Sequence, residues 1–318
     1  MSLQLKKSGK SITIVVPVYN EVKNIGIFIS EIEKCLKSLM SYEILFVCDP
    51  STDGTEAEII SFSKKFENIK AIFLSRRFGQ ALALRAGLDF ADSDACILMD
   101  VDLQDPPEVI PRMIEEWSKG AKVVLAKRTS RTGEFPLRKY TASVFYRVIS
   151  KFSKFPIPRN TGDFRLLDRV VILELRKFRE QISFMRGLVA AVGFETKTVE
   201  FNRPGRFSGE TKYNKYFGSL AVATSGIIGY STFLLTLSTF LGMTISFLSL
   251  ITAVLYAIAK LIGFPFPLGN PTIVILILMT LGIVLVSNGV LGIYVSKIFD
   301  EVKQRPLYIV ERKVGFRD

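Results

Sequence analysis

Residues 95–105 read ACILMDVDLQD, an apolar run that ends in a group of acidic side chains. The run is typical of a buried strand, and the acidic residues follow where that strand would leave a sheet. In open α/β sheets, ligands bind at this edge, beyond the carboxyl ends of the strands. Asp100, Asp102 and Gln104 offer the hard oxygen ligands that Mg²⁺ or Mn²⁺ prefers. The alternative interpretation is a solvated acidic turn in front of a helix that begins near Pro106.

Strands and helices alternate on both sides of this stretch, which indicates an α/β fold with a mostly parallel sheet and helices on both faces. Apolar β-branched runs predict strands, and apolar residues at helical spacing predict helices. We expect strands at 11–16, 42–48, 69–74, 95–99 and 122–126, and helices at 24–37, 55–66, 79–91 and 107–119. Further along, we expect helices at 138–155 and 184–192, a short strand at 163–168 and a basic loop at 202–215.

Two long uncharged stretches follow the α/β part. No charged residue occurs at 216–259 or at 261–296, and about 20 apolar residues suffice for a helix to span a bilayer. The glycines and prolines of residues 263–271 separate the stretches, so we expect two transmembrane helices near 234–257 and 273–295. A buried helical hairpin of a soluble protein is the alternative.

The chain is therefore expected to divide into three parts. A domain at 1–215 precedes two transmembrane helices within 231–297, and a basic tail at 298–318 follows them. Amphipathic juxtamembrane helices are expected within 135–155 and 216–230, at the membrane surface. The flanks of the membrane segment are basic and its internal turn is uncharged, so the domain and both termini are predicted to be cytoplasmic. The polar start of the chain has no pattern of a signal peptide.

Composition limits the chemistry. The chain of 318 residues carries a net charge of +12 and no histidine, which excludes histidine-based catalysis. Beside membrane helices, the positive charge favours an anionic bilayer or a phosphate-bearing substrate over nucleic acid. Cys35, Cys48 and Cys96 have no metal-site spacing and fit a reducing compartment. Ser287 and Asn288, within the second apolar stretch, predict hydrogen bonds between helices, inside the chain or in a homo-oligomer.

Polar residues also follow the first two predicted strands. PVYNE stands at residues 17–21 and DPSTDGT at 49–55. The tyrosine and glutamate of the first segment and the leading aspartate of the second are suited to hold the base and ribose of a nucleotide. Residues 51–54 are also explained as the turn that begins the following helix. Neither a Walker A motif nor a Rossmann glycine fingerprint follows the first strand, which argues against a P-loop nucleotidase or a dinucleotide enzyme.

Taken in order, these motifs resemble the signature of family 2 glycosyltransferases. PVYNE, the turn at 49–55 and DVDLQ at 100–104 carry the likeness. Four further segments make it similar to the polyprenyl-phosphate glycosyltransferases related to dolichol-phosphate mannose synthase, in the bacterial branch with two C-terminal spans. They are RFGQA at 77–81, NTGDFR at 160–165, MRG at 185–187 and RPGRFSGETKY at 203–213. The resemblance covers nearly the whole chain.

The resemblance implies a GT-A-like nucleotide-sugar-binding sheet, a divalent metal (Mg²⁺ or Mn²⁺) and a lipid-phosphate acceptor. It places Asp102 and Gln104 on the metal, with Asp102 as a catalytic residue. Asp163 is a second catalytic candidate, for positioning the acceptor or the sugar hydroxyls. The nucleotide sugar would contact Pro17, Tyr19, Glu21, Asp49, Asp100 and Arg128, and the phosphate and acceptor groups would contact Arg203, Arg206, Lys212 and Tyr213.

The activity that the resemblance implies is sugar transfer, with inversion, from a nucleotide sugar to a polyprenyl phosphate. A UDP-glucose donor and an undecaprenyl-type acceptor are favoured, with a product that serves cell-envelope glycan modification. A lipid phosphate has a second pKa of about 6, so its oxygen is largely anionic at neutral pH and attacks with little help from a base. The enzyme would be a multi-pass protein of the cell inner (plasma) membrane.

Three residues depart from the family pattern. Cys48 and Pro50 stand where an aspartate and a glycine are expected, and Arg77 stands where asparagine is frequent. These departures leave the base open, so GDP-mannose and UDP-N-acetylglucosamine remain alternative donors. A non-catalytic, membrane-anchored nucleotide-sugar-binding scaffold is the alternative outside the enzyme class.

Overall fold

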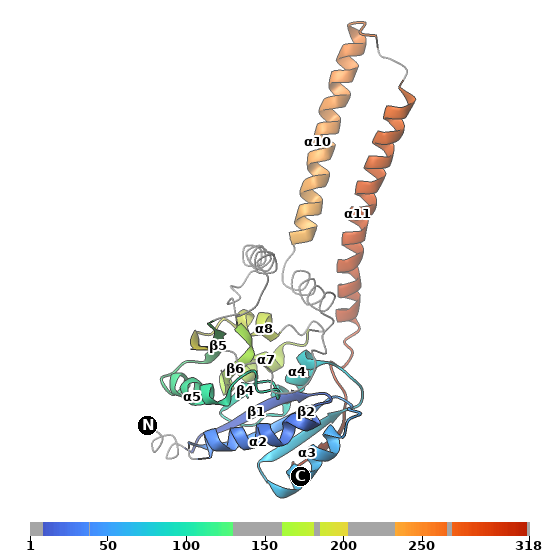
Figure 1. Ribbon diagram of the computed structural model, residues 1–318. Coiled ribbons are helices and arrows are strands. Elements are labelled where there is room, and N and C mark those ends of the chain that lie inside the picture. Colours follow the sequence, from blue (N-terminus) through green and yellow to red (C-terminus); the bar gives the residue numbers. More distant parts are fainter. Residues whose placement is uncertain are drawn as a thin grey trace. The chain divides into compact units, whose positions relative to one another are not determined.

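The computed structural model describes residues 9–37, 39–129, 161–180, 185–202, 233–265 and 269–316. The chain forms two compact units, of which one contains the sheet and the other two long helices (Figure 1). The first unit comprises residues 1–222 together with 306–318, and the second comprises residues 223–305. The chain thus leaves the first unit, forms the second and returns.

The first unit is built on one eight-stranded sheet. Its strands are β1 (Ser11–Val18), β2 (Ser41–Cys48), β3 (Ile69–Leu74), β4 (Ala95–Leu98), β5 (Val123–Arg128), β6 (Thr161–Asp168), β7 (Thr196–Phe201) and β8 (Val310–Val314). Their order is β7-β5-β6-β4-β1-β2-β3-β8. Strands β4, β1, β2 and β3 run parallel, and β6 and β8 flank them in antiparallel orientation. The predicted mostly parallel sheet is confirmed.

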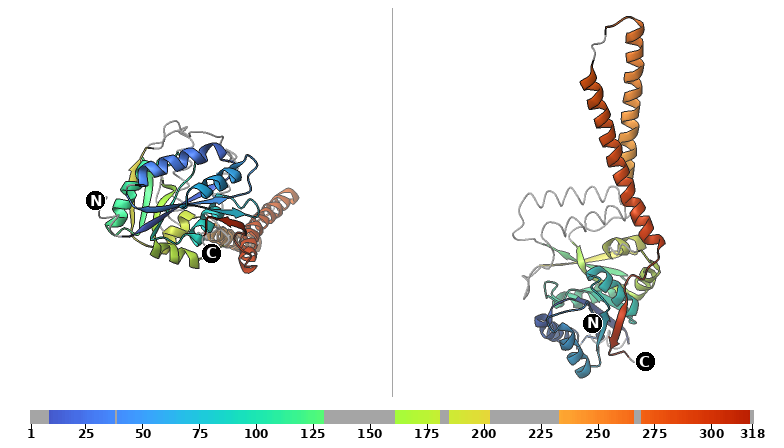
Figure 2. Two further views of the ribbon diagram at one scale, coloured as in Figure 1. Left: turned by 90° about the horizontal axis from the view of Figure 1, so that it is seen from below. Right: turned by 90° about the vertical axis from the view of Figure 1, so that its right-hand side faces the viewer.

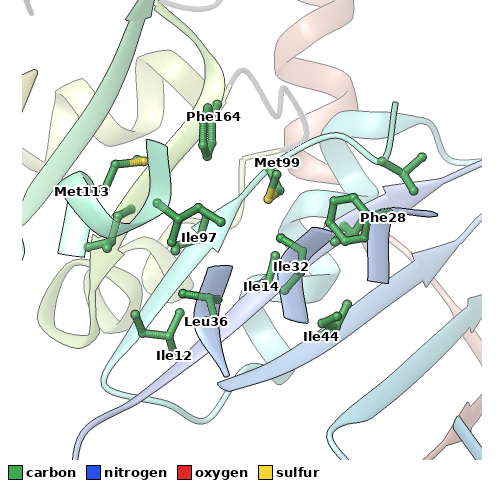
Figure 3. Close-up of a cluster of buried hydrophobic side chains, with 14 of the residues drawn as sticks. Ile12, Ile14, Phe28, Ile32, Leu36, Ile44, Ile97, Met99, Met113 and Phe164 are labelled. Atoms are coloured by element: carbon green, nitrogen blue, oxygen red, sulfur yellow. The ribbon is translucent and has the colours of Figure 1, made fainter. Parts of the chain in front are cut away.

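Helices cover both faces of this sheet, as predicted (Figure 2). One face carries α2 (Val22–Leu36), α3 (Thr55–Lys65), the 3-10 turn η1 (Pro107–Val109) and α5 (Ile110–Ser118), and the other carries α4 (Gln80–Phe90), α7 (Arg169–Lys177) and α8 (Met185–Val192). Side chains of β1 alternate between the two layers, with Ile14 in the first and Val15 in the second. Figure 3 shows part of the first layer, to which Phe28 of α2, Ile14 of β1 and Ile97 of β4 belong. Burial on both faces explains why the central strands are mostly apolar.

The strand order creates a crevice at one edge of the sheet. The chain proceeds from β1 outward to β2 and β3, and then returns to the other side of β1 to form β4. The strand order thus reverses between β1 and β4, although the loops that follow both strands lead to helices on the same face. Such a switch point leaves room for a ligand beyond the carboxyl ends of the two strands.

The structure also differs from the expected elements. Sequence analysis missed β7 and β8, and the residues at 298–318, expected as a basic tail, end a helix and then supply β8. Both missed strands lie at edges of the sheet and have mostly exposed side chains, so they lack the apolar run of a buried strand. The helix expected at 138–155 lies outside the described residues.

The second unit consists of α10 (Phe233–Leu261) and α11 (Asn270–Val302). Each contains a stretch long and apolar enough to cross a membrane, Leu235–Leu261 and Met279–Val302. Neither stretch is buried, in contrast to a core hairpin of a soluble protein. The hydroxyl oxygens of Ser238 and Ser287 lie 2.6 Å apart. The predicted hydrogen bond of Ser287 between helices is therefore confirmed, and that of Asn288 stays a prediction.

Gly87 marks the closest approach of a helix to the sheet. A Cβ at this position of α4 would lie 2.1 Å from Cγ1 of Val15 and 3.2 Å from Cγ2 of Val47. We expect Gly87→Ala to force α4 away from β1 and β2, which costs about 1–3 kcal/mol of stability. Thermal unfolding followed by the fluorescence of Trp117, the single tryptophan, measures the effect.

Gly26→Ala in α2 is the matched control for Gly87→Ala. Its added Cβ would lie 3.5 Å from the Phe62 ring, an ordinary contact distance. Because alanine favours the helix by about 1 kcal/mol over glycine, this variant should be as stable as the parent chain or more stable. Equal stability of the two variants would contradict the tight packing of α4.

Candidate active site

A pocket opens at the switch point, beyond the carboxyl ends of the central strands. It is lined by residues from four consecutive strand ends or the loops that follow them. They are Pro17, Val18, Tyr19 and Glu21 at β1, Asp49 at β2, Arg77, Gly79, Gln80 and Ala83 after β3, and Asp100, Val101 and Asp102 at β4. Six residues predicted for the nucleotide sugar or the metal are thus brought together: Pro17, Tyr19, Glu21, Asp49, Asp100 and Asp102.

The loop after β1 is held by the turn after β2. Asn20 has φ of 52°, and its side-chain oxygen accepts a hydrogen bond from the backbone N–H of Thr52 at 2.8 Å. The backbone N–H of Glu21 donates to Oγ1 of Thr55 at 2.8 Å, and that of Asn20 donates to Oγ of Ser51 at 3.0 Å. The turn therefore fixes the backbone that directly follows Tyr19.

Asp53 of the same turn also holds the first loop. Its carboxylate accepts hydrogen bonds from the backbone N–H of Val22 at 3.1 Å and from Thr55. Burial by itself would raise the pKa of Asp53, but these hydrogen bonds hold the pKa below its ordinary value. The turn role expected for residues 51–54 is seen for Ser51 and Asp53, which in addition bind the loop after β1.

Asp49 connects β2 to the loop between β3 and α4. Its carboxylate is buried and accepts the backbone N–H groups of Phe78 at 3.0 Å and of Gly79 at 2.9 Å, one on each oxygen. Gly79 has φ of 89°, a backbone conformation that residues other than glycine rarely adopt. The backbone N–H of Asp49 donates to the carbonyl of Val18 at 3.0 Å, so one residue links three strand ends.

Arg77 of that loop and Gln80, the first residue of α4, belong to the RFGQA motif, but no role was assigned to them from the sequence. The guanidinium of Arg77 lies 4.0 Å from the centre of the Tyr19 ring, in cation–π geometry. Among the described residues that line the pocket, Arg77 is the only cation, opposite three aspartates and Glu21. The amide of Gln80 donates to Oδ1 of Asp100 at 2.7 Å and orients it. An arginine within a motif of small and polar residues was the signal for the first of these.

Asp102 lies at the end of the pocket next to β4. It is buried, and its Oδ1 accepts the backbone N–H of Gln104 at 3.1 Å across Leu103, which has φ of 57°. The turn brings the carboxylate and the amide side chain of Gln104 onto one short loop. No group of three or more histidine, cysteine or acidic side chains that could hold a metal occurs among the described residues. Oxygen donors of this kind fit Mg²⁺ or Mn²⁺, which bind through one or two carboxylates and take their other ligands from water and substrate phosphates.

Arg128 and Asp163, predicted to contact the substrates, do not line the pocket in the described structure. Nη2 of Arg128 lies 3.8 Å from Oδ1 of the buried Asp105. Asp105 is not the N-cap of the following turn η1, because that position is taken by Pro106. The interpretation of the acidic residues after β4 as a solvated turn in front of a helix is therefore wrong for Asp105, which is buried. Gly162 makes room for this arginine, since a Cβ there would lie 2.8 Å from its Nη2.

Asp163 lies between two arginines. Its Oδ1 is 3.3 Å from Nε of Arg186 and 3.5 Å from Nη2 of Arg165. Arg165 is buried and donates to the carbonyl of Gly162 at 2.6 Å, and burial lowers its pKa to about 10. The paired carboxylate fits a positioning role. The four predicted phosphate and acceptor residues Arg203, Arg206, Lys212 and Tyr213 lie outside the described residues.

Cys48 lies beside Asp49, at a position where the resemblance implies an aspartate. Burial raises the pKa of its thiol to about 12, so the side chain is neutral at physiological pH. Its Sγ donates to the carbonyl of Asp49 at 3.3 Å. Compared with the aspartate that the resemblance implies here, the neutral thiol adds no negative charge to this edge of the sheet, and it makes a polar contact.

The chain is similar to known proteins over nearly its whole length. The family described as Glycosyl transferase family 2 matches residues 13–176. An uncharacterized glycosyltransferase of Synechocystis sp. is 40% identical over 301 residues, which cover 94% of each chain. A prophage bactoprenol glucosyl transferase homolog of Escherichia coli is 39% identical and covers 95% of this chain and 98% of its own length. The bactoprenol glucosyl transferase of Shigella phage SfII is also 39% identical, over 95% of this chain and 97% of its own.

Among solved structures, the glucosyl-3-phosphoglycerate synthase of Mycobacterium tuberculosis has a TM-score of 0.48 and 18% sequence identity. The match covers 70% of this chain and 79% of that enzyme.

Asp49→Asn tests the link between β2 and the loop at 75–79. An amide oxygen can accept only one of the two N–H groups and its NH₂ group opposes the other, so we expect a loss of about 1–3 kcal/mol. Hydrogen exchange of residues 75–80 should accelerate, and the unfolding temperature should fall. Asp92→Asn, which breaks the exposed ion pair with Arg169 at 2.8 Å, is the control and should change neither. If hydrogen exchange of residues 75–80 in Asp49→Asn stays at the parent rate, Asp49 does not hold this loop.

Proposed function

The chain belongs to glycosyltransferase family 2, and from this premise we propose that it transfers glucose from UDP-glucose to a polyprenyl phosphate of the undecaprenyl type. One observation carries the proposal: the Tyr19, Asp49, Asp100 and Asp102 pocket occurs in a chain that also contains two apolar helices of membrane-spanning length. Relatives named bactoprenol glucosyl transferase align over nearly the full chain, including those helices.

The donor is proposed to lie across the carboxyl ends of β1, β2 and β4. Tyr19 and Asp49 would contact the nucleoside, since an aromatic ring and a carboxylate suit stacking and hydrogen bonding to the base or the ribose. Asp100, oriented by Gln80, would face the sugar. Pro17 and Glu21 would complete the wall of the nucleoside site.

The reaction is proposed as a direct displacement with inversion. An anionic oxygen of the lipid phosphate forms a bond to the anomeric carbon as the bond from that carbon to the pyrophosphate breaks, and UDP leaves. Because the phosphate oxygen is already ionised at neutral pH, no histidine is required. The main barrier is the charge that grows on the departing diphosphate, which cationic groups stabilise.

Several residues would supply that positive charge. A Mg²⁺ or Mn²⁺ ion held by Asp102 and Gln104 would neutralise the leaving diphosphate. Arg77 is the cation in the described lining of the pocket, and we assign it to the donor. Arg128 is proposed for the donor phosphates, and Arg203, Arg206, Lys212 and Tyr213 for the donor and acceptor phosphates.

Asp163 would position sugar hydroxyls or the acceptor, with its carboxylate held by two guanidinium groups.

The two apolar helices give the enzyme access to its lipid acceptor. A polyprenyl phosphate has its phosphate at the headgroup level and its tail in the hydrocarbon, so the enzyme must be held at the bilayer. We propose that both helices span the inner (plasma) membrane, with the catalytic unit and both termini in the cytoplasm. Residues 306–316 return to the sheet, which requires that both ends of the helical hairpin lie on one side. A homo-oligomer is proposed from the polar Asn288 within the second apolar helix.

The full-length protein in phospholipid nanodiscs tests this function directly. With UDP-[¹⁴C]glucose, undecaprenyl phosphate and Mg²⁺ or Mn²⁺, we expect a labelled lipid that mild acid releases as glucose. Asp102→Asn should lower kcat/KM by about 100-fold or more, because a charge that stabilises the leaving group is lost. The exposed Asp92→Asn variant is the control and should keep full activity. GDP-mannose and UDP-N-acetylglucosamine are tested in parallel, and a failure of all three donors to label a lipid would refute the enzyme proposal.

Arg77→Ala should weaken the binding of UDP about threefold to 30-fold, the range expected from the loss of a cation beside a partly desolvated ring. Isothermal titration of UDP into the full-length protein measures this change. Arg76→Ala is a closely matched control, because its guanidinium also lies 4.0 Å from an aromatic centre, that of Phe78, but does not line the pocket. Equal affinities of both variants and the parent would exclude Arg77 from the donor site.

A further inference from the structure

The segment that follows the second apolar helix docks beside the donor pocket. After α11 ends at Val302, residues 306–316 join the first unit, where β8 pairs antiparallel with β3. The pairing reaches the end of β3, where the backbone N–H of Ser75 donates to the carbonyl of Ile309 at 3.0 Å. Ser75 is the first residue of the loop that carries Arg77 and Gly79 into the pocket.

The same segment also holds the far end of α4. The half-buried Tyr308 donates its hydroxyl to Oδ2 of Asp89 at 2.9 Å. Burial, followed by the charge of Asp89, raises the pKa of Tyr308, so the hydroxyl keeps its proton at physiological pH. Asp89 is paired in turn with the buried Arg85 at 3.3 Å. Tyr308 therefore attaches the segment to an internal ion pair of α4.

Two further contacts strengthen this docking. The rings of Phe316 and Phe90 meet edge to face, with centres 6.2 Å apart. Nζ of Lys313 lies 4.2 Å from the centre of the Phe90 ring. The last turn of α4 is thus held by residues from both ends of the returning segment.

The loop between β3 and α4 consequently contacts the pocket on one side and the returning segment on the other. Toward the pocket, the backbone of Phe78 and Gly79 binds Asp49, and Arg77 lies on Tyr19. On the other side, the ring of Phe78 packs against an apolar cluster to which Tyr308 and Val310 also belong. Displacement of the segment would free Ser75 and the end of α4 together.

We propose that the segment Pro306–Phe316 positions the donor-binding loop, with Tyr308 as a positioning residue that acts through Asp89 and α4. The inference rests on the proposed function, since it assigns the loop to the nucleotide sugar. It makes donor binding depend on a segment that follows the second apolar helix in the chain. A protein whose helical hairpin is misplaced would therefore bind its donor poorly.

The test uses the full-length protein in nanodiscs and the Tyr308→Phe variant, which removes one hydroxyl and keeps the ring. We expect the KM for UDP-glucose and the Kd for UDP to rise about threefold to tenfold, the range typical of coupling through packed elements. The kcat and the KM for undecaprenyl phosphate should stay within about twofold of the parent values. Hydrogen exchange of residues 75–80 should accelerate.

Arg312→Gln is the matched control in the same returning segment. Arg312 pairs with Glu56 of α3 at 2.6 Å and lies 4.3 Å from the centre of the Phe73 ring, and neither contact involves the loop or α4. Its substitution should leave the donor KM and the UDP affinity unchanged. Equal effects of Tyr308→Phe and Arg312→Gln would show that β8 only stabilises the sheet, and would overturn the proposal.

A double-mutant cycle supplies a second measurement. If Tyr308 acts through Asp89, then Tyr308→Phe should weaken UDP binding no further in the Asp89→Asn background, whereas independent roles would give additive effects. Additive effects, or a Tyr308→Phe variant with parent-like Kd and KM, would overturn the proposal. The outcome is separable from the proposed function: a parent protein that binds UDP but transfers no sugar would refute the function, while the Kd values still decide the inference.

Discussion

The carboxylate of Asp49 is the interaction on which the pocket depends. It is buried at the end of β2, and each of its oxygens accepts one backbone N–H from the loop that begins α4. These two hydrogen bonds hold the backbone between Arg77, which lies against the Tyr19 ring, and Gln80, which donates to Asp100. A buried charge that is satisfied by backbone donors costs little, and it orders a loop that carries a glycine with positive φ.

The sheet order explains why these contacts occur at one place. Because β1 lies between β2 and β4, the loops after three neighbouring strands meet at one edge and contribute an aromatic ring and several carboxylates. The loop after β3 adds the cation. An aromatic ring, several carboxylates and a cation together suit a donor that combines a planar base, hydroxyl groups and a diphosphate. The apolar hairpin, which we propose gives access to the lipid acceptor, is inserted between β7 and β8 and leaves the central strands uninterrupted.

Much of this fold could be predicted from the sequence because the central strands are buried on both faces. Their apolar runs and the helical periods between them gave strands at 42–48 and 69–74 that match β2 and β3 to within one residue. Edge strands carry no such signal: β8 reads VERKV, and its place beside β3 depends on a return of the chain across more than two hundred residues.

Part of the candidate site could likewise be predicted from the sequence, and part could not. Pro17, Tyr19, Asp49 and Asp102 follow parallel strands, so their meeting was implied by the fold. The contact of Arg77 with Tyr19 depends on the direction of two side chains, which local sequence does not specify. Arg128 and Asp163 were assigned roles without knowledge of their neighbours in space, because Asp105 comes from the loop after β4 and Arg186 comes from α8.

The central claim is that this pocket binds a nucleotide sugar together with a divalent cation at Asp102. A crystal structure of the full-length protein with UDP-glucose and Mn²⁺, with anomalous diffraction at the manganese edge, tests the claim most directly. We predict one anomalous peak within bonding distance of the Asp102 carboxylate, and density for uridine between Tyr19 and Asp49. Manganese bound elsewhere, or a nucleotide outside the residues after β1, β2 and β4, would contradict the claim.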